Sequence, residues 1–190
     1  DELNKFPVVT DIHSALEKKP DAVIISNPTA LHLEVAIPAA QSGCPLLLEK
    51  PLSHNLNGTE QLRKIVWENR LTVLVGFQFR FHPGLQKIKE IISNQEIGRV
   101  LYFRSHWGEF LPGWHPWEDY RKGYSARQDL GGGVVLTLCH PLDYLHWLFG
   151  EVVELAAVTK KLSDLEIEVE DTAEILMNFN SGVLGCLHLD

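Results

Sequence analysis

The sequence predicts an α/β fold in which a parallel sheet is followed by a separate α+β domain with a mainly antiparallel sheet. In residues 1–78, short and continuous apolar runs alternate with amphipathic helical patterns, which is typical of βαβ units and of a parallel sheet covered on both faces. From residue 79 on, this alternation of apolar runs and helical patterns ends. The last segments alternate apolar and polar side chains with a period of two, which favours strands joined by short turns. We therefore expect two domains, at residues 1–78 and 79–190.

The first domain has three expected strands, each apolar in its middle, and two expected amphipathic helices. Gly43 follows the first of these helices and is a favourable residue for ending it. In chain order the elements are strand 21–26, helix 31–42, strand 45–49, helix 57–69 and strand 72–76. Ligands of such sheets bind beyond the carboxyl ends of the strands, so candidate residues should lie just after each strand.

The second domain begins with a helix and a strand and then contains a long loop. The loop is rich in Trp, Pro, Tyr and charged residues, and three glycines follow it before another helix. In chain order we expect helix 83–93, strand 99–107, loop 108–128, a glycine-rich and helical segment at 130–149, and strands 152–159, 172–179 and 182–189.

Composition excludes several classes of function. The chain of 190 residues has a formal charge of −8, which does not favour binding to nucleic acid or to an anionic membrane. No apolar stretch reaches the roughly 18 residues that a membrane span needs. Cys44, Cys139 and Cys186 share no metal-type spacing, so we expect reduced, buried thiols, no metal site and a cytoplasmic protein.

Polar residues follow the first two expected strands. The tripeptide Glu49-Lys50-Pro51 ends the second strand, where a partly desolvated lysine can take part in proton transfer. Proline after it restricts the backbone of Lys50, although a lysine at a strand end can also simply project into water.

The segment Ser26-Asn27-Pro28-Thr29 follows the first strand. Its side chains can hydrogen-bond a ribose or an amide, and an Asx turn that caps the next helix explains Asn27 equally well. His32, in the first turns of that helix, could face a cofactor or lie at the surface.

A late helix presents four notable side chains on one face. His140, Asp143, Tyr144 and Trp147 are spaced i, i+3, i+4 and i+7. A histidine with a carboxylate one turn away suits proton transfer to or from a sugar hydroxyl, and the alternative is an interior histidine on a packed helix. The triplet Gly131-Gly132-Gly133 just before it lets the backbone approach another group closely, but it is weak evidence for phosphate binding.

The segment Trp114–Arg121 is a predicted loop that contains two tryptophans, a tyrosine and several charged residues. Such side chains stack on sugar or base rings and hold anions through arginine. We interpret the segment as a lid or binding wall, with an interface loop between subunits as the alternative. Its candidate substrate-binding residues are Trp114, His115, Tyr120 and Arg121.

An ordered series of motifs resembles the glucose–fructose oxidoreductase and inositol dehydrogenase (Gfo/Idh/MocA) family. The series comprises Asp21 to Pro28, Glu49-Lys50-Pro51-Leu52, Gly76 to Phe81, Ile97 to Val100, and Gly131 to Gly133 ahead of His140-Pro141-Leu142-Asp143. The resemblance implies a partial Rossmann-like sheet and hydride transfer between NAD or NADP and a sugar or nucleotide-linked sugar. The loop at Trp114–Arg121 resembles a branch associated with surface-polysaccharide biosynthesis.

The same resemblance assigns roles to individual residues. Lys50 and His140 would be catalytic and would meet across a domain cleft. The cofactor would lie along Ser26, Asn27, Pro28, His32, Glu49 and Lys50. Arg80 and Asp143 would join the loop residues in binding the substrate, and Arg104 and Arg127 could also serve an anionic one. A homo-oligomer, dimer or tetramer, is also implied.

Two departures from the family pattern matter. The glycine-rich G-x-G-x-x-G segment of the first βαβ unit is absent, so we expect this fragment to bind dinucleotide poorly and to be inactive by itself. The family's Asp four residues before the histidine is replaced by Leu136. The alternatives are therefore transient oxidation during epimerisation or glycoside cleavage, and a catalytically silent binding or assembly module of the same fold.

Overall fold

The computed structural model describes residues 6–190, which form two compact units divided after Gly76. The first unit ends with the third strand of a parallel sheet, and the second begins at Phe77. Among the described residues, no helix is both long and apolar enough to cross a membrane.

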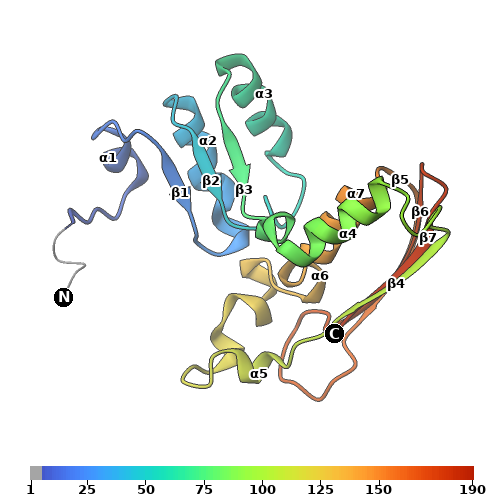
Figure 1. The fold of residues 1–190 in the computed structure, drawn as a ribbon. Helices are drawn as coiled ribbons and strands as arrows, with labels where there is room; N and C mark the ends of the chain where they lie inside the picture. Colours follow the sequence, from blue (N-terminus) through green and yellow to red (C-terminus); the bar gives the residue numbers. More distant parts are fainter. Residues whose placement is uncertain (1–5) are drawn as a thin grey trace. The chain divides into compact units, whose positions relative to one another are not determined.

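The first unit is a three-stranded parallel sheet with strand order β1-β2-β3 (Figure 1). The strands are β1 (Val23–Ile25), β2 (Leu46–Leu48) and β3 (Val73–Val75), and the crossover helices are α2 (His32–Gln41) and α3 (Thr59–Asn69). These elements confirm the predicted strand–helix alternation, and Gly43 follows α2 with a φ of +82°. The short helix α1 (Ile12–Leu16), which was not predicted, is capped by Asp11, whose carboxylate accepts a hydrogen bond from Ser14 N.

Only one face of this sheet is covered in the described residues, so the prediction of cover on both faces is wrong for them. The side chains of Ile24, Leu47 and Leu74 lie side by side in register on the other face and are 72%, 41% and 60% exposed. Two right-handed crossovers that advance in the same direction put both helices on the same side of the sheet. The buried side chains of Ile25 and Leu48 therefore lie in one apolar cluster with residues of α2 and α3.

The second unit is, as predicted, an α+β fold with a mixed, mainly antiparallel sheet. Its strand order is β4-β7-β6-β5. Strand β4 pairs parallel with β7, whereas β7–β6 and β6–β5 are antiparallel. The strands are β4 (Tyr102–Trp107), β5 (Val152–Lys160), β6 (Thr172–Phe179) and β7 (Leu184–Leu189), and the helices are α4 (Pro83–Ser93), α5 (Leu111–Trp114), α6 (Val134–Thr137) and α7 (His140–Phe149). The expected loop 108–128 thus contains α5 and two 3₁₀ turns, Tyr120–Lys122 and Tyr124–Ala126.

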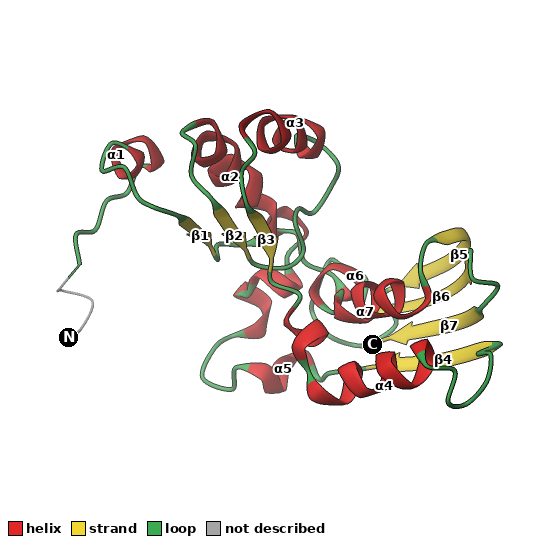
Figure 2. Ribbon diagram, turned by 45° about the horizontal axis from the view of Figure 1, so that its top comes forward, coloured by secondary structure: helices red, strands yellow, loops and turns green. Residues whose placement is uncertain are grey.

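The core of this unit lies between the helices and one face of the sheet. Figure 2 shows α4 and α7 along that face. Alternate residues of β6, such as Ile175 and Met177, are buried against Leu145 and Leu148 of α7, because successive side chains of a strand point to opposite faces.

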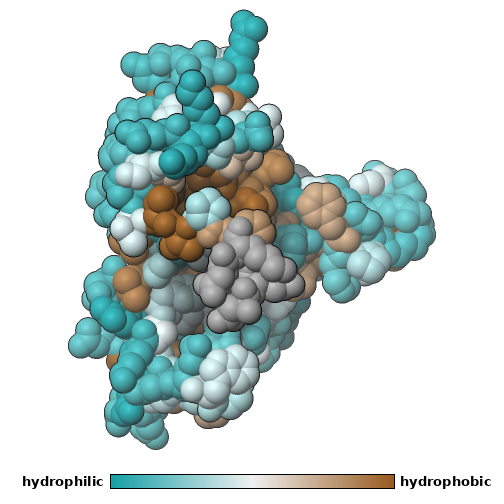
Figure 3. Space-filling model, turned by 90° about the vertical axis from the view of Figure 1, so that its left-hand side faces the viewer, coloured by the Kyte–Doolittle hydropathy of each residue, from teal (hydrophilic) through white to brown (hydrophobic). Residues whose placement is uncertain are grey.

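Apolar side chains also reach the surface on the opposite face and at the edge strand, where Leu176 is 45% and Val158 is 59% exposed. Figure 3 shows another side of the molecule, where brown apolar areas are bordered by teal polar side chains.

Candidate functional site

The first group of candidate residues lies at the carboxyl edge of the parallel sheet. Glu49 N–H donates to the Ile25 carbonyl at 2.8 Å, which holds the segment after β2 beside the segment after β1. Ser26 and Glu49 are exposed, whereas Asn27, Pro28 and Lys50 are half-buried. The Lys50–Pro51 peptide bond is cis. Five of the predicted cofactor-binding residues are therefore collected at one edge.

His32, the sixth predicted cofactor-binding residue, is 1% exposed and contacts both segments. Its Nδ1 lies 2.9 Å from the Pro51 carbonyl oxygen and its Nε2 lies 2.9 Å from the Asn27 carbonyl oxygen. Because carbonyl oxygens only accept, a neutral ring satisfies one of these contacts and a protonated ring satisfies both. Both nitrogens of His32 are thus used on backbone, and it can influence a ligand only through the two segments that it holds.

Asn27 has one buried acceptor that this edge does not satisfy. Its Nδ2 donates to the Leu31 carbonyl at 3.1 Å, so the Asx turn that the sequence allowed as an alternative, in which Oδ1 would accept from a backbone N–H, is not formed. Its Oδ1 is buried and has no hydrogen-bond partner among the described residues. An unsatisfied buried acceptor costs free energy, so this atom calls for a donor from outside the described chain.

The second group surrounds His140 at the start of α7. The ring is 8% exposed and is enclosed by Phe79, Phe77 and Trp107, whose ring centroids lie 4.7, 6.0 and 6.4 Å away. Phe77 and Phe79 come from the segment just after β3, and Trp107 is the last residue of β4. Side chains from two separate segments therefore fix the plane of the imidazole ring.

Arg80 and Asp143 bind each other beside this histidine. The guanidinium donates from Nε to Oδ2 at 2.8 Å and from Nη2 to Oδ1 at 2.7 Å, and the Asp143 side chain is only 10% exposed. This contact with Asp143 raises the pKa of Arg80. Both oxygens of Asp143 are occupied, so a substrate would meet the pair rather than a bare carboxylate.

The triple glycine allows close approach of protein groups, as its sequence suggested. An added Cβ at Gly132 would lie 2.5 Å from the Ser125 carbonyl oxygen, and one at Gly133, where φ is +105°, would collide with the Glu170 carboxylate. The Glu170 carbonyl also accepts from Val134 N at 3.0 Å, and its Oε1 accepts from Val135 N at 3.3 Å. A carboxylate therefore occupies the start of α6, where a phosphate would have to bind.

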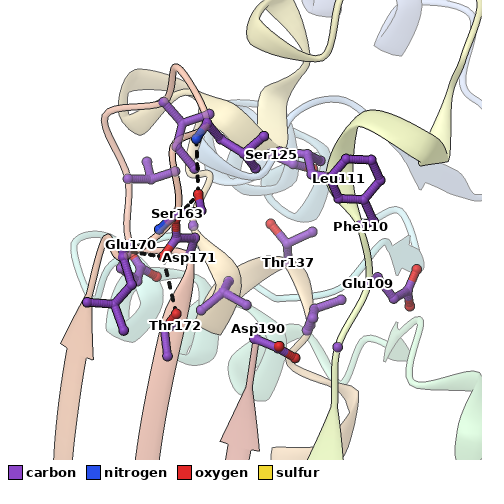
Figure 4. Close-up of a pocket in the computed structure, with 18 of the residues that line it drawn as sticks. Glu109, Phe110, Leu111, Ser125, Thr137, Ser163, Glu170, Asp171, Thr172 and Asp190 are labelled. Carbon is purple, nitrogen blue, oxygen red and sulfur yellow. Dashed lines mark hydrogen bonds between the residues drawn. The ribbon is translucent and has the colours of Figure 1, made fainter.

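A cavity of about 860 Å³ lies wholly within the second unit, between the 108–114 segment, α6 and the loop that precedes β6 (Figure 4). Thr137, one turn before His140, projects toward it, and Phe110, Leu111 and Trp114 form an apolar wall. The titratable residues among the described residues that line it are His106, Glu109, Asp164, Glu170, Asp171 and Asp190. Its lining is acidic, with no lysine or arginine from residues 6–190.

The loop residues predicted to bind substrate have different surroundings. Trp114 lines the cavity and packs against the core, whereas His115 is exposed and pairs with Glu118 at 3.6 Å. Tyr120 Oη accepts from Glu166 N at 3.1 Å. Arg121 contacts Asp119 at 2.8 Å and Glu166 at 2.7 Å, and these hydrogen bonds raise its pKa.

Tyr120 and Arg121 therefore join the Trp114–Arg121 segment to the loop before β6. Of the four predicted loop residues, Trp114 alone is among the described residues that line the cavity. Thr137 and Glu170, which also line the cavity, were not predicted from the sequence as site residues. The glycines were the one available signal for Glu170, because they indicated that some group approaches the backbone there.

Lys50 belongs to the first unit and His140 to the second, so their meeting stays a prediction. The first unit has the strand–helix alternation of a nucleotide-binding domain. The α+β unit that follows contains a buried histidine enclosed by aromatic rings. Residues 2–77 match the family model described as oxidoreductase family, NAD-binding Rossmann fold, and residues 85–190 match the GFO/IDH/MocA C-terminal domain. The chain belongs to the Gfo/Idh/MocA family of oxidoreductases.

Individual relatives agree with this membership. The chain is 30% identical over 183 residues to myo-inositol 2-dehydrogenase of Thermotoga maritima, which covers 93% of the chain and 52% of that protein. It is 29% identical over 138 residues to levoglucosan dehydrogenase of Pseudarthrobacter phenanthrenivorans, covering 72% of the chain and 36% of that relative. The chain thus spans about a third to a half of the length of these curated relatives.

A solved structure shares the fold. The WlbA dehydrogenase of Bordetella pertussis, in complex with NADH and UDP-GlcNAcA, superposes with a TM-score of 0.80 at 24% identity, covering 95% of this chain and 52% of that one.

Proposed function

We propose that the protein that carries this chain is an NAD(P)-dependent dehydrogenase that transfers hydride to or from a carbon of a sugar or nucleotide-linked sugar. Family membership of both units supports this, as do the relatives that act on inositol and levoglucosan. The observation that carries the proposal is the carboxyl edge of the parallel sheet, where Lys50 lies beside a segment with an unsatisfied buried acceptor.

The residues at this edge fit a dinucleotide. Asn27 Oδ1 requires a hydrogen-bond donor, and a carboxamide or a ribose hydroxyl supplies one. Ser26 and Glu49 are exposed beside it and offer a hydroxyl and a carboxylate. Bound nicotinamide would supply the hydride chemistry, while this edge supplies position and charge. His32 would maintain the edge by holding the Asn27 and Pro51 carbonyls.

Lys50 and His140 would assist the transfer of the hydroxyl proton of the substrate. When a secondary alcohol is oxidised, the carbon loses a hydride and the hydroxyl loses a proton. His140 would accept that proton, and the Lys50 ammonium would hydrogen-bond the substrate oxygen and stabilise negative charge on it. Enclosure by Phe79 and Trp107 excludes water from one side of the imidazole and limits its rotation.

Of the two substrate classes, charge distribution favours a neutral sugar or polyol over a nucleotide-linked sugar, whose phosphates are anionic. Of the four arginines suggested for an anion, Arg80, Arg121 and Arg127 are each paired with carboxylates. The cavity next to α6, in which Thr137 and Trp114 could contact a sugar ring, is lined by acidic side chains. An anion entering it would be repelled, whereas hydroxyl groups could donate to these carboxylates.

One observation favours a second candidate, a catalytically silent binding module. Leu136 replaces the family's aspartate, and a leucine cannot support proton transfer. Turnover distinguishes the two candidates.

The test is a hydride-transfer assay on the full-length protein with NAD⁺ and NADP⁺ and a panel of neutral sugars, polyols, uronates and nucleotide sugars. We expect turnover of a neutral compound that falls at least about 100-fold in Lys50→Ala and in His140→Ala. Lys64→Ala, which changes an exposed lysine of α3, is the matched control and should keep full activity.

A His140→Ala enzyme with unchanged turnover and an unchanged pH–rate profile would remove His140 from the mechanism. Absence of turnover across the panel, with the dinucleotide still bound, would support the silent module.

A further inference from the structure

Three neighbouring strands of the second unit bring histidines and a carboxylate together on the face of the sheet opposite the helices. His106 of β4 is the register partner of His188 in β7, and His188 is the register partner of Glu174 in β6. Register partners on one face have side chains that touch, because adjacent strands lie about 4.8 Å apart. The two imidazole rings are accordingly 4.8 Å apart between centroids, with an interplanar angle of 85°.

Asp190 completes this cluster from the end of β7. Its Oδ1 lies 2.9 Å from His106 Nε2, and its Oδ2 lies 3.8 Å from His188 Nε2. The backbone of Asp190 is held on both sides, because its N–H donates to the Trp107 carbonyl at 3.2 Å and its carbonyl accepts from Glu109 N at 2.9 Å. These two backbone hydrogen bonds therefore hold the Asp190 carboxylate between the two Nε2 atoms.

Gly108 provides the space for that carboxylate. A Cβ added at residue 108 would take the place of Asp190 Oδ1 and would lie 3.2 Å from His106 Nε2. Gly108 has no positive φ, so backbone conformation does not require glycine here. The missing side chain instead allows Asp190 to approach His106.

Glu174 orients one of the histidines. Its Oε1 lies 2.6 Å from His188 Nδ1, so the nitrogen that faces Glu174 carries the hydrogen and the Nε2 lone pair is directed toward the cluster. This carboxylate–histidine arrangement is the usual outer shell of a histidine metal ligand.

We propose that His106 Nε2, His188 Nε2 and the Asp190 carboxylate bind a divalent first-row transition-metal ion of the zinc class. The ligand atoms lie within 4.8 Å of one another. Tetrahedral coordination at about 2.0–2.1 Å needs them about 3.4 Å apart, a change that side-chain rotations can supply. Two imidazoles with one carboxylate suit Zn²⁺, Co²⁺ or Ni²⁺ better than Mg²⁺ or Ca²⁺, which prefer oxygen ligands.

The site leaves one coordination position open. His106 and Asp190 also line the cavity of the second unit, so the ion would lie at its rim, within reach of a hydroxyl or carboxylate of a bound molecule. Nothing in this inference requires the proposed dehydrogenase activity.

The test is titration of the metal-free, full-length protein with ZnCl₂ by calorimetry, and with CoCl₂ by visible absorption, which reports tetrahedral coordination. We expect one site that is lost in His106→Gln and in His188→Gln. In Glu174→Gln its Kd should rise about 10–100-fold, because only the outer shell changes. Gly108→Ala, which keeps every ligand but displaces Asp190, should weaken binding at least about 10-fold.

His115→Gln, which removes an exposed histidine outside the cluster, is the matched control and should bind like the parent. Metal affinity that is unchanged in both His106→Gln and His188→Gln would overturn the proposal, as would the absence of any site tighter than about 100 µM. Because His106 and His188 lie on an outer face, circular dichroism should show that these variants fold.

Discussion

Arg80 and Asp143, 63 residues apart in the chain, form a two-point ion pair that joins the segment after β3 to the first turn of α7. The pair lies next to His140, whose ring contacts Phe79, the residue before Arg80. The first turn of a helix also favours a carboxylate such as Asp143. The position of the histidine is therefore coupled to this pair.

We expect a double-mutant cycle of Arg80→Ala and Asp143→Asn to give a coupling free energy of about 1 kcal/mol in urea unfolding. A larger value is not expected, because the Arg80 side chain is 41% exposed and water screens the pair. The exposed pair Lys87–Glu90 on α4 is the control and should give about 0.3 kcal/mol. Equal coupling in the two cycles would contradict a special role for Arg80 and Asp143.

His32→Gln should lower the free energy of unfolding by about 1–3 kcal/mol, because a part-buried backbone carbonyl, that of Asn27 or Pro51, loses its hydrogen bond. In the full-length protein it should raise KM for the dinucleotide more than it lowers kcat, since His32 acts by positioning the two segments. Thermal unfolding and steady-state kinetics measure these effects. His13→Gln, an exposed histidine of α1, is the control, and parent-like values in both variants would contradict the prediction.

Gly133→Ala should destabilise the protein by about 2 kcal/mol or more, for two reasons. Its φ of +105° disfavours any side chain, and a Cβ there collides with the Glu170 carboxylate. Gly113→Ala is the matched control, because its Cβ would meet only Phe110 at 3.5 Å and its φ is not positive. The comparison is made by urea unfolding, and similar losses in the two variants would disprove the collision.

Asp171 should make the loop before β6 sensitive to acid. Burial raises the pKa of this carboxyl, but hydrogen bonds from Ser163, Leu162 and Thr172 outweigh burial and hold its pKa below the ordinary value of 3.8. Because the folded-state pKa is depressed, the stabilisation is present above about pH 4 and is lost as pH falls through the lowered value.

Hydrogen exchange of the Leu162 and Ser163 amides, which donate to Asp171, measures this effect between pH 3 and 6. Protection should fall toward the acid end in the parent after correction for intrinsic rates. In Asp171→Asn it should be low and independent of pH. A parent loop that keeps full protection at pH 3 would contradict the prediction.

Much of the fold could be predicted from local pattern. The helix at 83–93 and the strand at 172–179 were predicted at their observed bounds, since strong periodicity and clear end signals mark them. The positions of Lys50 and Asn27 at a strand end follow in the same way, because chain order and the parallel arrangement specify the edge. His140 was predicted from its spacing to Asp143 on one helix face, although nothing local indicated that the rings of Phe77, Phe79 and Trp107 enclose it.

The remaining features depend on pairs that are distant in the chain. Arg80 meets Asp143 through helix packing, Glu170 meets Gly133 through a loop, and His106 meets His188 through the register of two strands. The sequence by itself determined which segments form helices and strands and which residues end them, because backbone preferences and side-chain periodicity act over a few residues. Only the tertiary structure decided which of those ends carry paired charges, an enclosed histidine or a set of metal ligands. Strand register and helix packing minimise the free energy of the whole core, and no short stretch of sequence specifies them.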